Sequence, residues 1–283
     1  MTNNKNKYII KQNFLFFLLL LFTLPTFAQL RFDYPITNIE PAEIIVTYSL
    51  KYQKDSLNHN FIQQSDMLLF IGQNTSKFLS SNLYSFDTIM NHITNLAEFQ
   101  EFLMDRYKPF PRIAYSIYKN YPKGKLTFIE HIPSSTFKYE ENLELFNWQL
   151  SSDTATISGY KAQKATCDFG GRNWIAWFSP EIPYSDGPYK FNGLPGLIVK
   201  ISDTRNHYVF ELEYIEKPIH KPIIDLEEKD FVETTKQDFF RAKDAFYNNI
   251  SSRAKDAGLS SEVQQKVARR ATERNNPIEL KRK

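Results

Sequence analysis

The chain has 283 residues, 42% of them hydrophobic and 24% charged, with 35 basic against 32 acidic side chains. This near balance excludes a protein that binds nucleic acid through its net charge. One cysteine, Cys167, excludes an intramolecular disulfide, and its strand-like surroundings (KATCDF) favour a small buried hydrophobe over a reactive thiol.

Residues 1–28 have the pattern of a secretory signal peptide. Three lysines precede an apolar core at 14–24, and the small-residue exit at 26–28 predicts cleavage before Gln29. The alternative is a membrane anchor, but the apolar core is about half of the roughly 20 residues that a spanning helix needs. The remaining 255 residues carry 32 charges of each sign. We therefore expect an exported, formally neutral protein, periplasmic, outer-membrane-associated or secreted, with no transmembrane segment after cleavage.

The first predicted elements are strands followed by a helix. Residues 43–54 mix β-branched, aromatic and polar side chains, and residues 66–71 and 77–80 flank the turn GQNTS. Asn95 and Glu98 have capping-box spacing, and apolar residues then recur on one helical face. A helix over 95–106, lying against the sheet, is predicted.

The middle of the chain reads as strands separated by short turns. Residues 112–118 and 125–131 form one predicted hairpin, and further strands are expected at 139–150, 154–160, 161–169 and 172–178. Parallel strands would need helical crossovers between them. The pattern therefore predicts an antiparallel meander, followed by an irregular proline-rich loop at 179–189.

The segment FNGLPGLIVKIS predicts a tight corner before a central strand. Pro195 suits the second position of a type II turn and Gly196 the positive φ that must follow. Residues 197–201 then alternate as a buried strand, and 207–215 are expected to return beside it. The structural turn consists of Gly193, Leu194, Pro195 and Gly196.

The C-terminal region is predicted to be helical. Asp225 and Glu228 suggest a capping box opening a helix through Phe239 and Phe246, with Gly258 as a break and Ser261 as a restart. Residues 266–283 have a net charge of +5. They form either a solvated helix with a frayed tail or an electrostatic contact to an acidic partner or membrane surface.

Together these elements predict an α+β, mainly β fold. We expect a curved, half-barrel-like antiparallel sheet with one helix packed on it and C-terminal helices. After the signal peptide, residues 29–223 would form the β-rich domain, and 224–283 the C-terminal helical segment and basic tail.

Three stretches carry a family resemblance: GYKAQKATCDFGGRNWIAWFSPEIPYSDGPYKFNGLPGLIVKISD at 159–203, DMLLFIGQNTSKF at 66–78 and NNPIEL at 275–280. The chain resembles the GLPGLI family, exported bacterial envelope proteins named for the hexapeptide at 193–198. The resemblance implies secretion and a shared β-rich fold, and it brings no established activity. Ala162 stands where relatives often carry cysteine, so no role for that thiol carries over.

Familiar catalytic and phosphate-binding patterns do not occur in the sequence, and no cofactor or metal site is predicted. None of the histidines lies within ligand spacing of another (His59, His92, His131, His207 and His220). The alternative to a non-catalytic protein is a hydrolase whose site forms only in the fold, where His131 or His207 meets a carboxylate and a hydroxyl.

Aromatic residues make up 15% of the chain and gather around the proline-rich loop. They are either core residues or the lining of a binding groove on the concave face of the sheet, with Arg172 and Lys190 at its rim. The candidate groove residues are Arg172, Trp174, Trp177, Tyr184, Tyr189, Lys190 and Phe191. We expect a non-catalytic envelope protein that binds a hydrophobic ligand or an outer-membrane protein, with a purely structural component as a further alternative.

Overall fold

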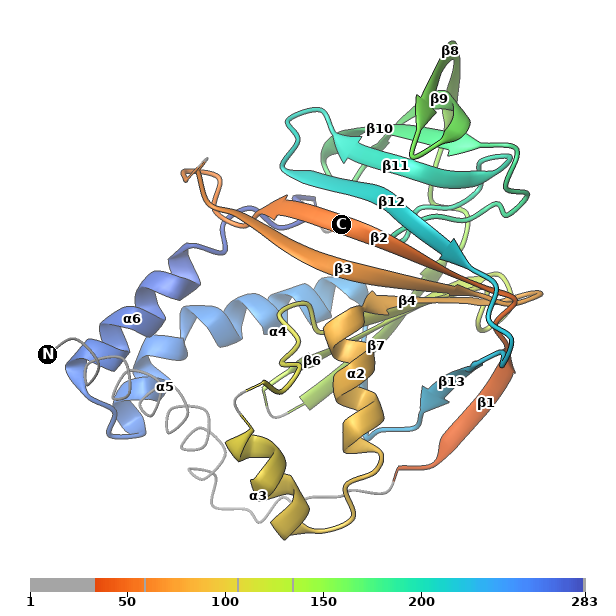
Figure 1. Ribbon diagram of the computed structural model, residues 1–283. Coiled ribbons are helices and arrows are strands. Elements are labelled where there is room, and N and C mark those ends of the chain that lie inside the picture. Colours follow the sequence, from red (N-terminus) through yellow and green to blue (C-terminus); the bar gives the residue numbers. More distant parts are fainter. Residues whose placement is uncertain (1–33, 59, 106, 134, 282–283) are drawn as a thin grey trace, which may run out of the picture. The chain divides into compact units, whose positions relative to one another are not determined.

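The computed structural model describes residues 34–281, apart from 59, 106 and 134 (Figure 1). The predicted signal peptide lies outside the described residues. Contacts divide the chain into a β-rich unit, Phe32–Arg241 with Asn275–Lys283, and a second unit that contains Ala242–Arg274. Residues 275–281 thus belong to the β-rich unit.

The β-rich unit contains one twelve-stranded sheet that does not close, because β14 and β8 lie at its two ends. Its order is β14-β7-β6-β5-β4-β3-β2-β12-β11-β10-β9-β8. One half is the run β2 (Ile44–Gln53), β3 (Ile62–Ile71), β4 (Ser76–Ser80), β5 (Tyr115–Lys119), β6 (Lys125–Ile132) and β7 (Ser135–Asn142). The other half is β8 (Gln149–Ile157), β9 (Tyr160–Phe169), β10 (Arg172–Ser179), β11 (Leu197–Asp203) and β12 (Tyr208–Glu216).

This architecture confirms the α+β, mainly β class and most of the antiparallel meander. Within each half, neighbours in sequence are neighbours in the sheet. Two pairings depart from a simple meander: β12 pairs with β2, and β14 (Phe231–Glu233) runs parallel to β7. A separate two-stranded sheet pairs β1 (Ile36–Pro41) with β13 (Ile223–Glu227). Each of these pairs joins strands that are far apart in the sequence, and local sequence patterns do not predict such pairings.

The corner before β11 has the positive φ predicted for Gly196 but not the hydrogen bond of a type II turn. Gly196 N–H donates to the Leu194 carbonyl at 2.8 Å, and Leu197 N–H donates to the Ile182 carbonyl at 3.0 Å. Gly196 has φ +148°, and β11 lies between β10 and β12, both antiparallel to it. A Cβ atom at Gly196 would lie 2.2 Å from the carbonyl oxygen of Ser179. Leu197, Ile198 and Val199 are completely buried. Gly196 therefore serves both the turn and the close approach of two backbone segments.

Two helices follow β4, and one of them was not predicted. In α2 (Ser81–Met90), Ser80 is the N-cap and its Oγ accepts from the Leu83 N–H at 3.1 Å. The predicted helix is α3 (Leu96–Met104), where Asn95 accepts from the Glu98 N–H at 3.0 Å. The helix that packs on β3 and β4 is α2, through rings such as Tyr84 against Phe70. The expectation that 95–106 would be that helix was wrong, because the cap at Ser80 starts a helix sooner.

The predicted helix start at Asp225 was also wrong. Ile224 and Leu226 are buried, while the alternate residues Ile223, Asp225 and Glu227 are exposed or half-buried, and this two-residue alternation forms β13 (Ile223–Glu227). The helix begins later, as α4 (Lys236–Asn248), where Thr235 Oγ1 accepts from the Asp238 N–H at 3.1 Å. Two further helices follow, α5 (Ile250–Asp256) and α6 (Ser261–Thr272), the latter capped by Ser260.

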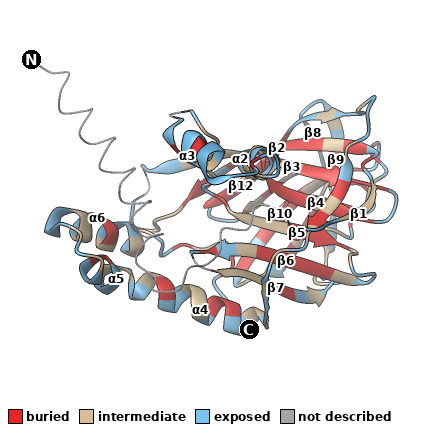
Figure 2. Ribbon diagram, turned by 90° about the horizontal axis from the view of Figure 1, so that it is seen from below, coloured by how far each residue is buried: buried red, intermediate tan, exposed pale blue. Residues whose placement is uncertain are grey.

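Buried residues are concentrated on the strands of the large sheet (Figure 2). Within the described part of the chain, no helix is both long and apolar enough to cross a membrane.

Candidate binding site

The aromatic residues predicted to line a groove are mostly in the interior. Trp174, Tyr189 and Phe191 are at most 1% exposed, while Trp177 and Tyr184 are half-buried. The Phe191 ring has its centroid 4.7 Å from that of Trp174 and packs against further rings from other segments. These rings fill space between backbone segments, and ligand binding by this cluster stays a prediction.

Arg172 does not lie at a rim, because its guanidinium is buried and fully engaged. Nη1 lies 2.9 Å from Asp203 Oδ2, and Nη2 donates to Asn276 Oδ1 at 2.6 Å. Nη2 also donates to the Pro277 carbonyl and Nε to that of Ile278, at 2.6 and 3.0 Å. The side chain therefore holds a segment near the C-terminus against β10.

Lys190 is completely buried too, within a group of four charged side chains that we call the Glu279 cluster: Glu141, Lys190, Lys236 and Glu279. Lys190 Nζ lies 2.8 Å from Glu279 Oε1, and Lys236 Nζ lies 2.6 Å from Glu279 Oε2. Burial by itself would raise the pKa of the Glu279 carboxyl, but the two lysines hold that pKa below its ordinary value. The cluster has two charges of each sign, so its net charge is zero.

Residues 275–281, which we call the C-terminal strap, are bound along much of their length. The Asn276 side chain donates to the Gln53 carbonyl at 2.6 Å, and Tyr208 OH donates to the Asn276 carbonyl at 2.7 Å. Leu280 N–H donates to the Gly170 carbonyl at 2.6 Å. The alternative of a frayed tail is therefore wrong for these residues, whose polar groups find partners on the sheet.

His131 and His207, the two histidines considered for a hydrolase site, lie in different surroundings. His131 Nδ1 lies 3.2 Å from Thr136 Oγ1, and His207 Nδ1 lies 3.4 Å from Arg172 Nη1. His59 lies outside the described residues. Among the described residues, no group of three or more histidine, cysteine or acidic side chains is placed to hold a metal ion.

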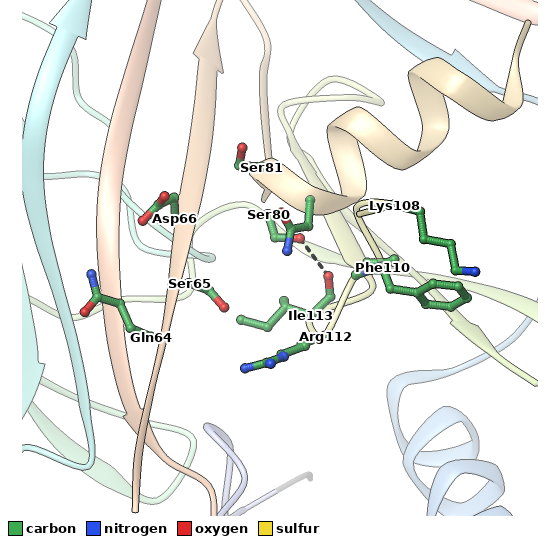
Figure 3. A pocket seen from close by; sticks show the side chains of 11 residues that line it. Gln64, Ser65, Asp66, Ser80, Ser81, Lys108, Phe110, Arg112 and Ile113 are labelled. Carbon is green, nitrogen blue, oxygen red and sulfur yellow. Dashed lines mark hydrogen bonds between the residues drawn. The ribbon is translucent and has the colours of Figure 1, made fainter. Parts of the chain in front are cut away.

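An open hollow in the β-rich unit lies elsewhere, beside β3 (Figure 3). It has a volume of about 650 Å³. Its walls come from β3, from the junction of β4 with α2, and from the loop before β5. The residues that line it are Gln64, Ser65, Asp66, Ser80, Ser81, Asn82, Lys108, Phe110, Pro111, Arg112 and Ile113.

This pocket exists because β4 is shorter than β3. The two strands pair only from Met67↔Ser80 to Ile71↔Ser76, since Ser80 caps α2 and the chain leaves the sheet there. Residues 62–66 continue to pair with β2 but, in the described part of the chain, with no strand on their other side. Ser80 Oγ also donates to the Ile113 carbonyl at 2.8 Å, which fixes the loop on the far side. The pocket thus occupies the line along which β4 would have continued.

Two charged side chains that line the pocket, those of Asp66 and Arg112, have no polar partner among the described residues. Within the described residues, the side chains of Asp66 and Arg112 form no hydrogen bond or ion pair. Lys108, in contrast, donates to the Leu103 carbonyl and lies 5.7 Å from the Phe110 ring centroid. Charged groups left without partners beside a hollow are available to a ligand.

Sequence reasoning missed this pocket entirely. One signal was present: the strand that includes residues 62–71 is polar in its first half (QQSD) and apolar in its second (MLLFI). Such a change along one strand indicates that only the second half is covered on both faces. The Glu279 cluster gave no comparable signal, because its members come from four distant segments.

The fold and site define a mainly β protein with a large open sheet and a polar pocket at a gap in it. A family model described as "Protein of unknown function (Porph_ging)" matches residues 171–200, which include the Gly-Leu-Pro-Gly turn. No curated protein matches the chain. Two solved structures of PNGF-II, in space groups C2 and P21, are 14% and 13% identical to it with a TM-score of 0.48. The alignments cover 70% of this chain and 32% of each PNGF-II chain.

Proposed function

We propose that the protein is an exported, non-catalytic envelope protein that binds a partner protein through the pocket beside β3. The observation that carries the proposal is the uncovered stretch 62–66 of β3, opening onto a hollow in which Asp66 and Arg112 have no partner among the described residues. Most residues that line the pocket are polar or charged, which favours a polar protein surface over the hydrophobic ligand that was the other expectation.

Export is supported by the N-terminal sequence and by the resemblance to the GLPGLI family. An electrostatic contact through the C-terminal region would involve α6, whose last turn carries Arg269 and Arg270, because the strap itself is bound to the sheet. N-terminal sequencing of protein recovered from the cell envelope should begin at Gln29. Recovery of the intact N-terminus from the cytoplasm would contradict export.

Site-specific photo-crosslinking in the producing cells tests the binding site. A photoreactive amino acid at Gln64 or Arg112 should give one discrete crosslinked product, identified by mass spectrometry, because both residues line the pocket. The matched control is Thr156, exposed on the far edge strand β8. Equal crosslinking at all three positions, or none at Gln64 and Arg112, would rule out this pocket as the binding site.

A further inference from the structure

The uncovered half of β3 presents backbone hydrogen-bonding groups in a defined direction. Along an antiparallel strand, the N–H and C=O of one residue point to the same side, and successive residues alternate sides. The Ile71 carbonyl accepts from Glu43 N–H at 2.7 Å, on the β2 side, whereas Gly72 N–H donates to Thr75 at 2.9 Å, on the β4 side. Counting back from Gly72 in steps of two, the backbone N–H and C=O groups of Ile62 and Gln64 point away from β2.

The pairing of β2 gives the same direction independently. Gln53 N–H donates to the His207 carbonyl at 2.8 Å, so odd-numbered residues of β2 face β12 and even-numbered ones face β3. In the register, these even-numbered residues pair with odd-numbered residues of β3, as in Tyr52↔Gln63 and Ile44↔Ile71. The N–H and C=O groups of Ile62 and Gln64 therefore face the gap that β4 leaves.

We infer that this gap is a slot for one added β-strand, supplied as an extended segment of the partner protein. The inference rests on the proposed function and names the kind of segment that the pocket takes. The segment would continue the line of β4, antiparallel to β3, and bond to the backbone of Ile62 and Gln64. Neighbouring strands lie about 4.8 Å apart, so the added strand falls between β3 and the 110–113 loop. Strand addition to an open sheet edge is an established mode of peptide recognition.

The side chains around the slot leave the edge accessible. Gln64 Nε2 donates to Ser49 Oγ at 3.1 Å, which places the Gln64 side chain over β2 and away from the edge. At the outer end of the slot, Phe61 and Ile62 are 53% and 63% exposed. These two side chains offer apolar contacts to an entering segment.

The Arg112 side chain indicates that the added segment carries an acidic residue. Figure 3 shows the Arg112 side chain extending from its loop toward β3, whereas the Lys108 side chain points away from the strand. A guanidinium with free donors binds a carboxylate by paired, charge-assisted hydrogen bonds. Asp66 would repel an acid placed near the α2 end, so the segment should carry its acidic side chain opposite Arg112. The occupant is thus an extended, acidic segment of another protein.

A random library of seven-residue peptides displayed on phage tests the inference with the full-length protein. Recovered peptides should be rich in β-branched residues and carry an acidic residue. Replacing Gln64 with proline (Gln64→Pro) removes an N–H that faces the slot but no bond to β2, and should weaken peptide binding by about tenfold or more. The matched control, Gln64→Ala, keeps that N–H and should bind within about twofold of the native protein.

Two further measurements keep the test independent of how the proline variant folds. Arg112→Glu, at an exposed and unpaired side chain, should lower affinity for the acidic peptides by about tenfold and recover basic ones instead. Two versions of each peptide, N-methylated at the odd or at the even amides, test the pairing. Only the version whose methyl groups replace the N–H groups that face β3 should lose binding. Equal loss in both versions, or no loss in either, would overturn strand addition.

The outcomes separate the inference from the proposed function. If crosslinks form at Gln64 in cells but no library peptide shows the alternating dependence, strand addition is wrong and the binding site stands. If neither experiment gives binding, both fail. A concentration-dependent dimer that Gln64→Pro abolishes would mean that the edge pairs with a second copy of this chain, which also overturns the inference.

Discussion

Lys190 Nζ lies 2.8 Å from Glu279 Oε1, and both side chains are completely excluded from solvent. This ion pair joins the loop before the Gly-Leu-Pro-Gly turn to the C-terminal strap. Tyr189 OH donates to the same carboxylate at 2.6 Å, so two consecutive loop residues hold one strap residue. The strap is therefore part of the core of the β-rich unit.

Replacing Glu279 with glutamine should destabilise the protein strongly. The change leaves the buried Lys190 and the half-buried Lys236 with only Glu141 as a counter-charge, and breaking a buried pair by removing one partner costs about 3–5 kcal/mol. The matched control is Glu233→Gln, whose carboxylate pairs with Lys138 but is 69% exposed, and should cost at most about 1 kcal/mol. Urea unfolding of the three proteins measures the difference. Equal costs for the two variants would contradict the role of the cluster.

The same carboxylate predicts a dependence of stability on pH. The pKa of Glu279 is lowered in the folded protein, against burial, by Lys190 and Lys236, so its contribution is fully present above the unfolded-state pKa of about 4.3. That contribution is lost as pH falls through the lower folded-state pKa. The free energy of unfolding should fall from about pH 4 downward. Glu279→Gln should show a shallower fall over that range, and an unchanged slope would count against this assignment.

Two glycine substitutions separate backbone strain from lack of space. Gly196→Ala places a Cβ 2.2 Å from a backbone oxygen in addition to the positive φ, and should cost about 3 kcal/mol or more. Gly159 also has positive φ, +84°, but nothing lies within 4 Å of its Cβ position, so Gly159→Ala should cost about 1 kcal/mol. Thermal and urea unfolding measure both. Similar costs would mean that the contact with Ser179 relaxes freely.

Cys167 should be inert in the folded protein. Burial, with a smaller contribution from Asp168, raises the pKa of its thiol to about 12, so almost no thiolate forms at neutral pH. A thiol-specific reagent at about pH 8 should label the protein only after denaturation. Rapid labelling under native conditions would show that the thiol is accessible.

Much of the sheet could be predicted from the sequence because its signals are local. The turn GQNTS and the polar and apolar alternation around Ile198 predicted the β3–β4 and β11–β12 pairings correctly. The helix start predicted at Asp225 failed where two local signals competed. The capping-box spacing was present, but burial of Ile224 and Leu226 formed a strand instead.

The candidate sites were less predictable. The aromatic cluster was recognised, but its sequence could not decide between groove and core, and the structure places Trp174 and Phe191 in the interior. Arg172 and Lys190 were expected at a rim because charged side chains are usually exposed. Their counter-charges Asp203 and Glu279 come from other segments, so burial with a partner could not be foreseen.

By itself, the sequence determined most strands of the large sheet, the positive φ at Gly196 and the expectation of export, since each depends on residues that are neighbours along the chain. Only the tertiary structure decided that β12 joins β2, that the strap enters the core, and that β4 ends before β3 does. Those features depend on burial and charge pairing between distant segments. Burial and charge pairing contribute free energy only when the distant segments are in contact. For this reason no local sequence pattern predicts the slot beside Gln64.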